Sequence, residues 1–158
     1  MKIFTKDNLL TQGEQESVLT YATRYCTYTV DKWIEIDNFD TQTFPLNKII
    51  NIARPYFDLS SMIGIECWAH FGKKSDPHID RDEDLFRKTG VVSTPLCSIV
   101  YYVDIQNLKG GSLLIGNNSI EPLSNRLVMF PPGMLHEVEP FTGTRSVLSI
   151  NPWSYKVQ

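Results

Sequence analysis

The feature that most restricts the fold of this chain is a run of short apolar segments that starts near Ser61 and continues almost to the end. β-branched and aromatic residues dominate these segments, and glycine, proline or asparagine separates them. The segments include MIGIECWAHF, LCSIVYYVDI, SLLIG, NRLVMF, LHEVEP and TRSVLSIN, and this part of the chain is expected to contain about seven or eight strands. Short strands joined by tight turns are typical of a sandwich or jelly roll, whose walls surround a central cavity.

The first 60 residues carry a different pattern, which predicts two helices and one strand. Apolar residues lie on one helical face of EQESVLTYATRYCTY, and KWIEI alternates like a short strand. A second helix is expected from Pro45, a favourable first-turn residue, to about Tyr56, with Pro55 near its end. We expect both helices to cover one face of a sheet, which gives a mainly β chain with N-terminal helices.

Length and composition favour a single intracellular domain. A chain of 158 residues suffices for one core, so we expect a helical part over about 1–60 and a β core over about 61–153. The formal charge of −3 argues against a basic surface for nucleic acid. The apolar runs are too short for a membrane span, and residues 1–10 lack a signal-peptide pattern. We therefore expect no membrane partner and a cytoplasmic location, and the oligomeric state stays open.

The cysteines carry little functional information. Cys26, Cys67 and Cys97 are odd in number, widely spaced and without a CxxC pair. This pattern favours neither a disulfide framework nor a thiolate zinc site. We expect three buried, reduced thiols.

Two of the three histidines lie in contexts that suggest a metal site. In the stretch DPHID, the alternation of an extended chain points His78 and Asp80 to the same side. In PPGMLHEVEP, a turn delivers His136 to the start of another strand. Two imidazoles and one carboxylate make up the facial triad of non-haem Fe(II) oxygenases, which leaves metal positions open. Each residue also has a plainer interpretation as an exposed or hydrogen-bonded side chain, and we assign His70 to that class.

Arg145 strengthens the pattern because it follows His136 by nine residues. The strand that begins at His136 leads into a turn over 140–143, and the next strand runs back beside it. The side chains of His136 and Arg145 can therefore face the same interior of the barrel. An arginine inside an apolar barrel is costly unless it meets an anion, and its fork matches a carboxylate. The alternative is a rim arginine paired with Glu137 or Glu139.

In this order, His78, Asp80, His136 and Arg145 resemble the motif of the 2-oxoglutarate and Fe(II)-dependent dioxygenases, specifically their prolyl-hydroxylase-like branch. The segments IVYYVD, GGSLLI and RLVMFPPGMLHEVEPFTGTRSVLSI are similar to consecutive strands of that branch. The resemblance covers roughly residues 62–153. It implies a double-stranded β-helix, a jelly roll of two facing antiparallel sheets.

The resemblance also implies roles for individual residues. His78, Asp80 and His136 would bind Fe(II), and Arg145 would hold the distal carboxylate of 2-oxoglutarate from the opposing sheet. Further cosubstrate-pocket positions of the branch correspond to Tyr102, Trp68, Leu113, Val138 and Ser149. The implied reaction consumes O2 and 2-oxoglutarate, gives succinate and CO2, and hydroxylates a substrate, with ascorbate as a candidate reductant.

The substrate side is less determined by the sequence. Trp68 stands where the branch commonly has a tyrosine, and Ser75 stands where an aromatic residue is common. The charged run 81–88, with the following loop to Thr94, is expected to be a surface loop that acts as a mobile flap beside the iron. A prolyl or other residue of a peptide or protein is the favoured substrate. The alternatives are a free amino acid or small metabolite and, last, a non-catalytic metal- or ligand-binding jelly-roll module.

Overall fold

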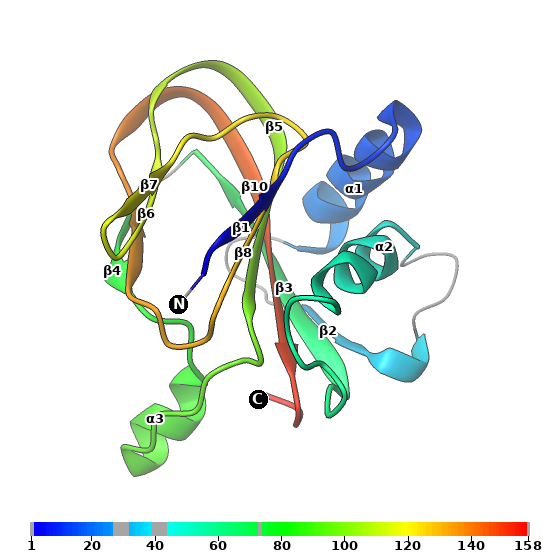
Figure 1. The fold of residues 1–158 in the computed structure, drawn as a ribbon, viewed down its shortest axis with the longest axis vertical. Helices are drawn as coiled ribbons and strands as arrows, with labels where there is room; N and C mark the ends of the chain where they lie inside the picture. Colours follow the sequence, from blue (N-terminus) through cyan, green and yellow to red (C-terminus); the bar gives the residue numbers. More distant parts are fainter. Residues whose placement is uncertain (1, 27–31, 39–43, 73, 158) are drawn as a thin grey trace.

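The computed structural model describes residues 2–26, 32–38, 44–72 and 74–157. It contains two facing antiparallel sheets, and helices lie behind the larger one (Figure 1). In chain order the elements are β1 (Phe4–Lys6), α1 (Gln12–Tyr25), β2 (Lys32–Glu35), a short 3-10 helix (Ile36–Asn38), α2 (Phe44–Ala53), β3 (Gly64–Phe71), β4 (Ser75–His78), α3 (Glu83–Thr89), β5 (Ser98–Gly110), β6 (Leu113–Ile115), β7 (Asn118–Ile120), β8 (Leu127–Phe130), β9 (His136–Val138) and β10 (Phe141–Trp153). The larger sheet has the order β1-β8-β5-β10-β3-β2, and the smaller one β4-β9-β6-β7. This is the predicted double-stranded β-helix.

Both N-terminal helices form close to where the sequence predicts them. α1 begins after Thr11, whose hydroxyl accepts from the Glu14 N–H while the Glu14 carboxylate accepts from the Thr11 N–H, a capping box. The last two residues of its predicted range, 27 and 28, lie outside the described residues. α2 ends at Ala53 and not at Tyr56, because Pro55 has no N–H to continue the helix.

The larger sheet is buried on both faces, which explains the continuous apolar run in β5. Ile99 and Tyr101 face the helices, and Val100 and Tyr102 face the smaller sheet. The helix-side cluster includes Val18, Ala22, Leu46, Ile49, Ile50, Ile65, Cys67, Ala69, Leu148 and Ile150. α1 and α2 therefore cover the outer face of the large sheet, as predicted (Figure 1).

From residue 64 onward the described residues contain eight strands, which agrees with the seven or eight predicted there, but β4 and β7 were not among the segments expected. β4 is the polar segment 75–78, which pairs with β9. Residues 118–120 form a strand that pairs with β6. β10 begins at Phe141, within the turn expected over 140–143, and a register shift near Gly143 accommodates it. These additions are short and polar, so no apolar alternation marks them in the sequence.

The charged segment predicted as a surface loop instead forms helix α3. Asp82 caps its first turn by accepting from the Leu85 N–H at 2.8 Å, and Gly90 ends it with a φ of 74°. None of its residues is buried, and it projects from one end of the barrel (Figure 1). Among the described residues, no helix combines the length and apolar character needed to cross a membrane.

The three cysteines are buried and form no disulfide, as predicted. The sulfur atoms of Cys26 and Cys67 lie 3.4 Å apart. Their hydrogen bond, together with burial, raises the pKa of Cys67, and burial raises the pKa of Cys97 to about 12. Both thiols therefore stay protonated near neutral pH.

Candidate active site

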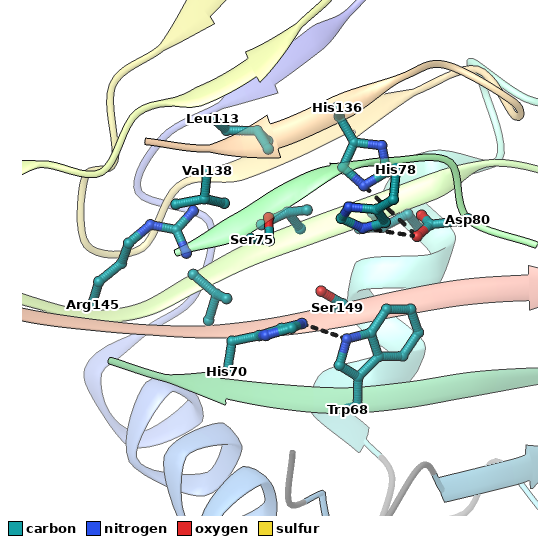
Figure 2. Close-up of a pocket in the computed structure, with 13 residues that line it drawn as sticks. Trp68, His70, Ser75, His78, Asp80, Leu113, His136, Val138, Arg145 and Ser149 are labelled. Carbon is teal, nitrogen blue, oxygen red and sulfur yellow. Dashed lines mark hydrogen bonds and ion pairs between the residues drawn. The ribbon is translucent and has the colours of Figure 1, made fainter. Parts of the chain in front are cut away.

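His78, Asp80 and His136 meet in the cavity between the two sheets (Figure 2). β4 and β9 pair so that the two histidines lie directly opposite each other, with ring centroids 4.3 Å apart. Asp80 Oδ1 lies 3.9 Å from His78 Nε2 and 3.7 Å from His136 Nε2. One ligand atom from each residue lies within 4.8 Å of the others. Two imidazoles and one carboxylate thus face a common point.

Backbone carbonyls fix the orientation of both imidazole rings. His78 Nδ1 lies 2.7 Å from the Asp76 carbonyl oxygen, and His136 Nδ1 lies 2.9 Å from the Met134 carbonyl oxygen. Because a carbonyl only accepts, each Nδ1 carries the proton and each Nε2 keeps its lone pair. The lone pairs point toward Asp80, which is the tautomer that a metal-binding histidine requires.

The carboxylate of Asp80 is held by Ser98. The Ser98 hydroxyl donates to Asp80 Oδ2 at 2.5 Å, which leaves Oδ1 beside the imidazoles. Burial lowers the pKa of His136, against the opposing effect of the Asp80 carboxylate, and keeps the ring neutral at neutral pH. This donor set fits a divalent ion such as Fe(II), held on one face. Sequence reasoning missed Ser98, although its place on the inward face of SIVYYV was a usable signal.

Arg145 enters the same cavity from β10 and is only 2% exposed. Its Nε donates to the Gly111 carbonyl at 3.0 Å, and its guanidinium carbon lies 5.2 Å from the Tyr102 ring centre and 5.9 Å from that of Phe141. Gly111 has a φ of 79°, and a Cβ there would lie 3.3 Å from Arg145 Cδ, so glycine leaves room for the side chain.

The guanidinium has no carboxylate partner among the described residues. The alternative of a rim arginine paired with Glu137 or Glu139 is therefore wrong. Burial lowers the pKa of Arg145, which reflects the cost of a charge held away from water. The hydroxyl of Tyr102, fully buried beside it, also lacks a hydrogen-bond partner within the described ranges. A buried cation without a carboxylate partner and a buried hydroxyl without an acceptor suit an anionic ligand.

A narrow slot of about 40 Å3 connects Arg145 with the triad. Its other lining residues are Trp68, His70, Ser75, Ile99, Val100, Leu113, Val138, Val147 and Ser149. All the residues that the family resemblance assigns to metal or cosubstrate binding line the slot, except Tyr102, which lies beside Arg145. Figure 2 shows Leu113 and Val138 on one wall and Ser149 on the other.

His70 is hydrogen-bonded, as its assignment to the plainer class suggested, but it also lines the slot. Its Nε2 accepts from the Trp68 indole N–H (Figure 2). Burial, followed by the nearby charge of Arg145, lowers the pKa of His70 to about 4. The ring is therefore neutral at physiological pH, and it shares the inward face of β3 with Trp68, which is two residues earlier.

A wider cavity of about 290 Å3 adjoins the triad and shares four lining residues with the slot. It is lined by Glu66, Trp68, His70, His78, Ile79, Asp80, Arg81, Glu83 and Asn151. Sequence reasoning did not single out Glu66 or Asn151. The metal position thus lies between two spaces: the slot, which ends at Arg145, and the wider cavity on the other side.

The comparisons with known proteins agree with this geometry. A family model described as the 2OG-Fe(II) oxygenase superfamily matches residues 64–155, which is more than half of the chain. No curated protein sequence matches this one.

Solved structures with the same fold include several prolyl hydroxylases. A prolyl-4-hydroxylase from Pseudomonas putida has a TM-score of 0.66 and 18% identity, over 98% of this chain and 88% of that one. The viral collagen prolyl hydroxylase of Paramecium bursaria Chlorella virus-1, in complex with 2OG, has a TM-score of 0.66 and 14% identity, over 99% and 97%. A prolyl hydroxylase from Trichoplax adhaerens, in complex with a hypoxia inducible factor peptide fragment, has a TM-score of 0.57 and 16% identity, over 96% and 83%.

Proposed function

This chain belongs to the 2OG-Fe(II) oxygenase superfamily, and on that premise we propose that it hydroxylates a prolyl or other residue of a peptide or protein. It is a 2-oxoglutarate- and Fe(II)-dependent dioxygenase, and the coproducts of the proposed reaction are succinate and CO2. One observation carries the proposal. Three metal-ligand atoms within 4.8 Å of one another share a slot with a buried guanidinium that has no anion partner among the described residues.

In this proposal the two ends of the slot have separate tasks. His78, Asp80 and His136 hold Fe(II), and Arg145 binds the distal carboxylate of 2-oxoglutarate with its terminal N–H groups. The hydroxyl of Tyr102 donates to the same carboxylate, which supplies the acceptor that this buried group lacks. Burial raises the pKa of Tyr102, so the hydroxyl keeps the proton that it donates.

The bound iron supplies the activation of O2 that is coupled to oxidative decarboxylation of 2-oxoglutarate and to substrate hydroxylation. The chain binds the cosubstrate, orients it toward the metal and excludes water from the slot. Leu113, Val138 and Val147 give the slot apolar walls, and Ser149 adds one small hydroxyl. Because the pKa of His70 is about 4, its ring adds no second positive charge near Arg145.

The position of α3 supports a peptide or protein over a small metabolite as substrate. A segment that enclosed the cavity would favour a small molecule. The α3 helix instead has no buried residue and projects from the barrel (Figure 1). The His78 side chain is 44% exposed. At its base, the Asp82 N–H donates to the Ser93 carbonyl and the Tyr155 hydroxyl donates to the Asp82 carboxylate. The mobility expected of this flap stays a prediction.

The test is turnover of the purified protein with Fe(II), 2-oxoglutarate, O2 and ascorbate, with succinate as the product measured. We expect His78→Ala and Asp80→Ala to abolish succinate formation, and a peptide library to gain one oxygen atom by mass only with the active protein. Asp104→Ala, a change on the β5 strand away from the slot, is the matched control and should keep activity. Metal-replete wild-type protein that neither binds nor consumes 2-oxoglutarate would refute the proposal.

A further inference from the structure

Asn151 brings a primary amide to the wall of the wider cavity. It lies on β10 two residues beyond Ser149, which lines the slot, so the alternation of the strand points both side chains into the barrel. His78 and Asp80 of the triad line the same cavity. A substrate that reaches the metal from this side therefore passes the amide.

The hydrogen-bonding groups of this amide are unmet within the described part of the chain. Asn151 is 2% exposed, and its Oδ1 is buried without a hydrogen-bond partner. Its Nδ2 likewise makes no hydrogen bond with a described residue. Because buried polar atoms in native proteins nearly always have a partner, we expect this amide to find one outside the chain.

The other polar side chains that line the wider cavity already have hydrogen-bond partners. The Trp68 indole donates to His70, Glu66 accepts from the Trp153 indole, Arg81 donates to Glu83, Asp80 accepts from Ser98, and the His78 ring is bonded to the Asp76 carbonyl. Within the described residues, Asn151 is therefore the polar group of this wall that a ligand can bind without breaking an existing hydrogen bond.

The amide can turn either of its polar atoms toward the cavity. A half-turn about the Cβ–Cγ bond exchanges Oδ1 and Nδ2, and it breaks no hydrogen bond because neither atom has one within the described residues. An asparagine side chain then offers an acceptor and a donor next to each other. In an extended peptide, the N–H and the C=O of one residue point to the same side, so they complement this pair of groups.

We propose that Asn151 is a specificity residue that binds the main chain of a peptide substrate. It accepts from the N–H and donates to the C=O of a residue next to the hydroxylated one. The inference rests on the proposed function and deepens it, because it names an uncharged peptide unit as the group that is recognised. A free amino acid offers an ammonium instead, which has no acceptor for the amide N–H.

The test removes one N–H group of the substrate at a time. The probes are acetylated tripeptide amides with a central proline, and analogues in which an ester oxygen replaces the N–H of the residue before or after the proline. The ester keeps the length of the chain and removes the donor. With the wild-type protein, we expect one of the two esters to lower kcat/KM about tenfold, because a buried acceptor then loses its donor.

Two variants of Asn151 decide whether this residue reads the N–H. In Asn151→Ala the acceptor is gone, so the ratio of kcat/KM between amide and ester probes should fall close to one. Asn151→Leu fills the same space without a polar atom and should give the same ratio, so either variant suffices if thermal unfolding shows that it is folded. Asn117→Ala, at an exposed position between β6 and β7, is the matched control and should keep the wild-type ratio.

Two results of these rate measurements overturn the inference while the proposed function stands. One is a wild-type protein that hydroxylates amide and ester probes equally well. The other is a preference for the amide probes that survives in the folded Asn151 variants.

A binding measurement separates the two proposals. Isothermal titration of the same probes into protein loaded with Mn(II) and 2-oxoglutarate without O2 reports affinity independently of turnover. Tighter binding of the amide probes that is lost in the Asn151 variants supports the inference even where no probe is hydroxylated. Equal affinity of amide and ester probes, no binding of any amide probe at millimolar concentration, or hydroxylation of free amino acids in place of peptides overturns it.

Discussion

Replacing Arg145 with methionine should stabilise the apoprotein and weaken 2-oxoglutarate binding at the same time. Methionine approximates the length of the arginine stem but carries no charge. Arg145 is only 2% exposed, and no carboxylate of the described residues forms an ion pair with its guanidinium. The two effects have opposite signs because one residue is costly for folding and required for the cosubstrate.

The expected magnitudes follow from the contacts of Arg145. A buried charge costs several kcal/mol to remove from water, and its removal recovers this cost. Against this, the variant loses the hydrogen bond to Gly111 and the contact with the Tyr102 ring, together about 3 kcal/mol. The net gain is about 2 kcal/mol, or about 4–8 °C in Tm for a chain of this size. Loss of the buried ion pair with 2-oxoglutarate costs about 3 kcal/mol, which raises its Kd about a hundredfold.

Thermal unfolding with and without 2-oxoglutarate measures both effects in one experiment. The protein is loaded with Mn(II) in the absence of O2, so that no turnover occurs. At a ligand concentration of about 100 times the wild-type Kd, binding stabilises the wild type by about 2.7 kcal/mol and the variant by about 0.4 kcal/mol. Arg54→Met, a change at an exposed arginine, controls for the loss of a positive charge.

Two results would refute the reasoning about Arg145. If the variant lost several kcal/mol of stability without ligand, the guanidinium would be a structural residue whose contacts outweigh its desolvation. If 2-oxoglutarate stabilised Arg145→Met as strongly as the wild type, the carboxylate would bind elsewhere. Either result would leave the metal triad untouched, because its three ligands come from β4, the segment just after it and β9, and not from β10.

Two further predictions test residues that support the site. The pKa of His70 is about 4 in the folded protein and 6.5 when unperturbed. The stability that the buried neutral ring contributes is therefore complete above about pH 6.5 and is lost as the pH falls toward 4, because the unfolded chain takes up the proton first. Urea unfolding should therefore show that the wild type loses about 2 kcal/mol more than His70→Gln between pH 7.5 and pH 5, and equal losses would contradict this. Ser98→Ala removes the hydroxyl that donates to Asp80, so titration with Mn(II) should show an affinity about ten- to a hundredfold lower, whereas an unchanged affinity would mean that the carboxylate needs no such support.

The fold could be predicted where side-chain pattern and structure coincide. The strands of the barrel core and both N-terminal helices bury apolar residues at regular intervals, and the sequence marks them. The strand before His78 and the strand after Gly116 could not be found, because SDPH and NSI are polar and exist through pairing with distant strands. Helix α3 was missed because its charged residues bury nothing, and its cap at Asp82 is the signal that sequence reasoning overlooked.

The candidate site divides in the same way. The triad residues and Arg145 are of types whose spacing along the chain carries information, so the sequence alone suggested them. Glu66 and Asn151 are ordinary residue types separated by 85 positions, and only the register of β3 against β10 brings them together. Residues that meet only through strand pairing leave no local pattern in the sequence, so the substrate-facing part of the site could not be predicted from the sequence alone.

The distribution of the site over two sheets links ligand binding to the stability of the barrel. His78 and His136 belong to the smaller sheet, and Arg145 and the support of Asp80 by Ser98 belong to the larger one. The strands of the smaller sheet have three or four residues each, so few backbone hydrogen bonds hold it. A metal and a cosubstrate that bind residues from both sheets add contacts between these two layers, beyond the side-chain packing and the Ser98–Asp80 hydrogen bond. The smaller sheet should therefore be the part whose amide exchange slows most when Mn(II) and 2-oxoglutarate bind.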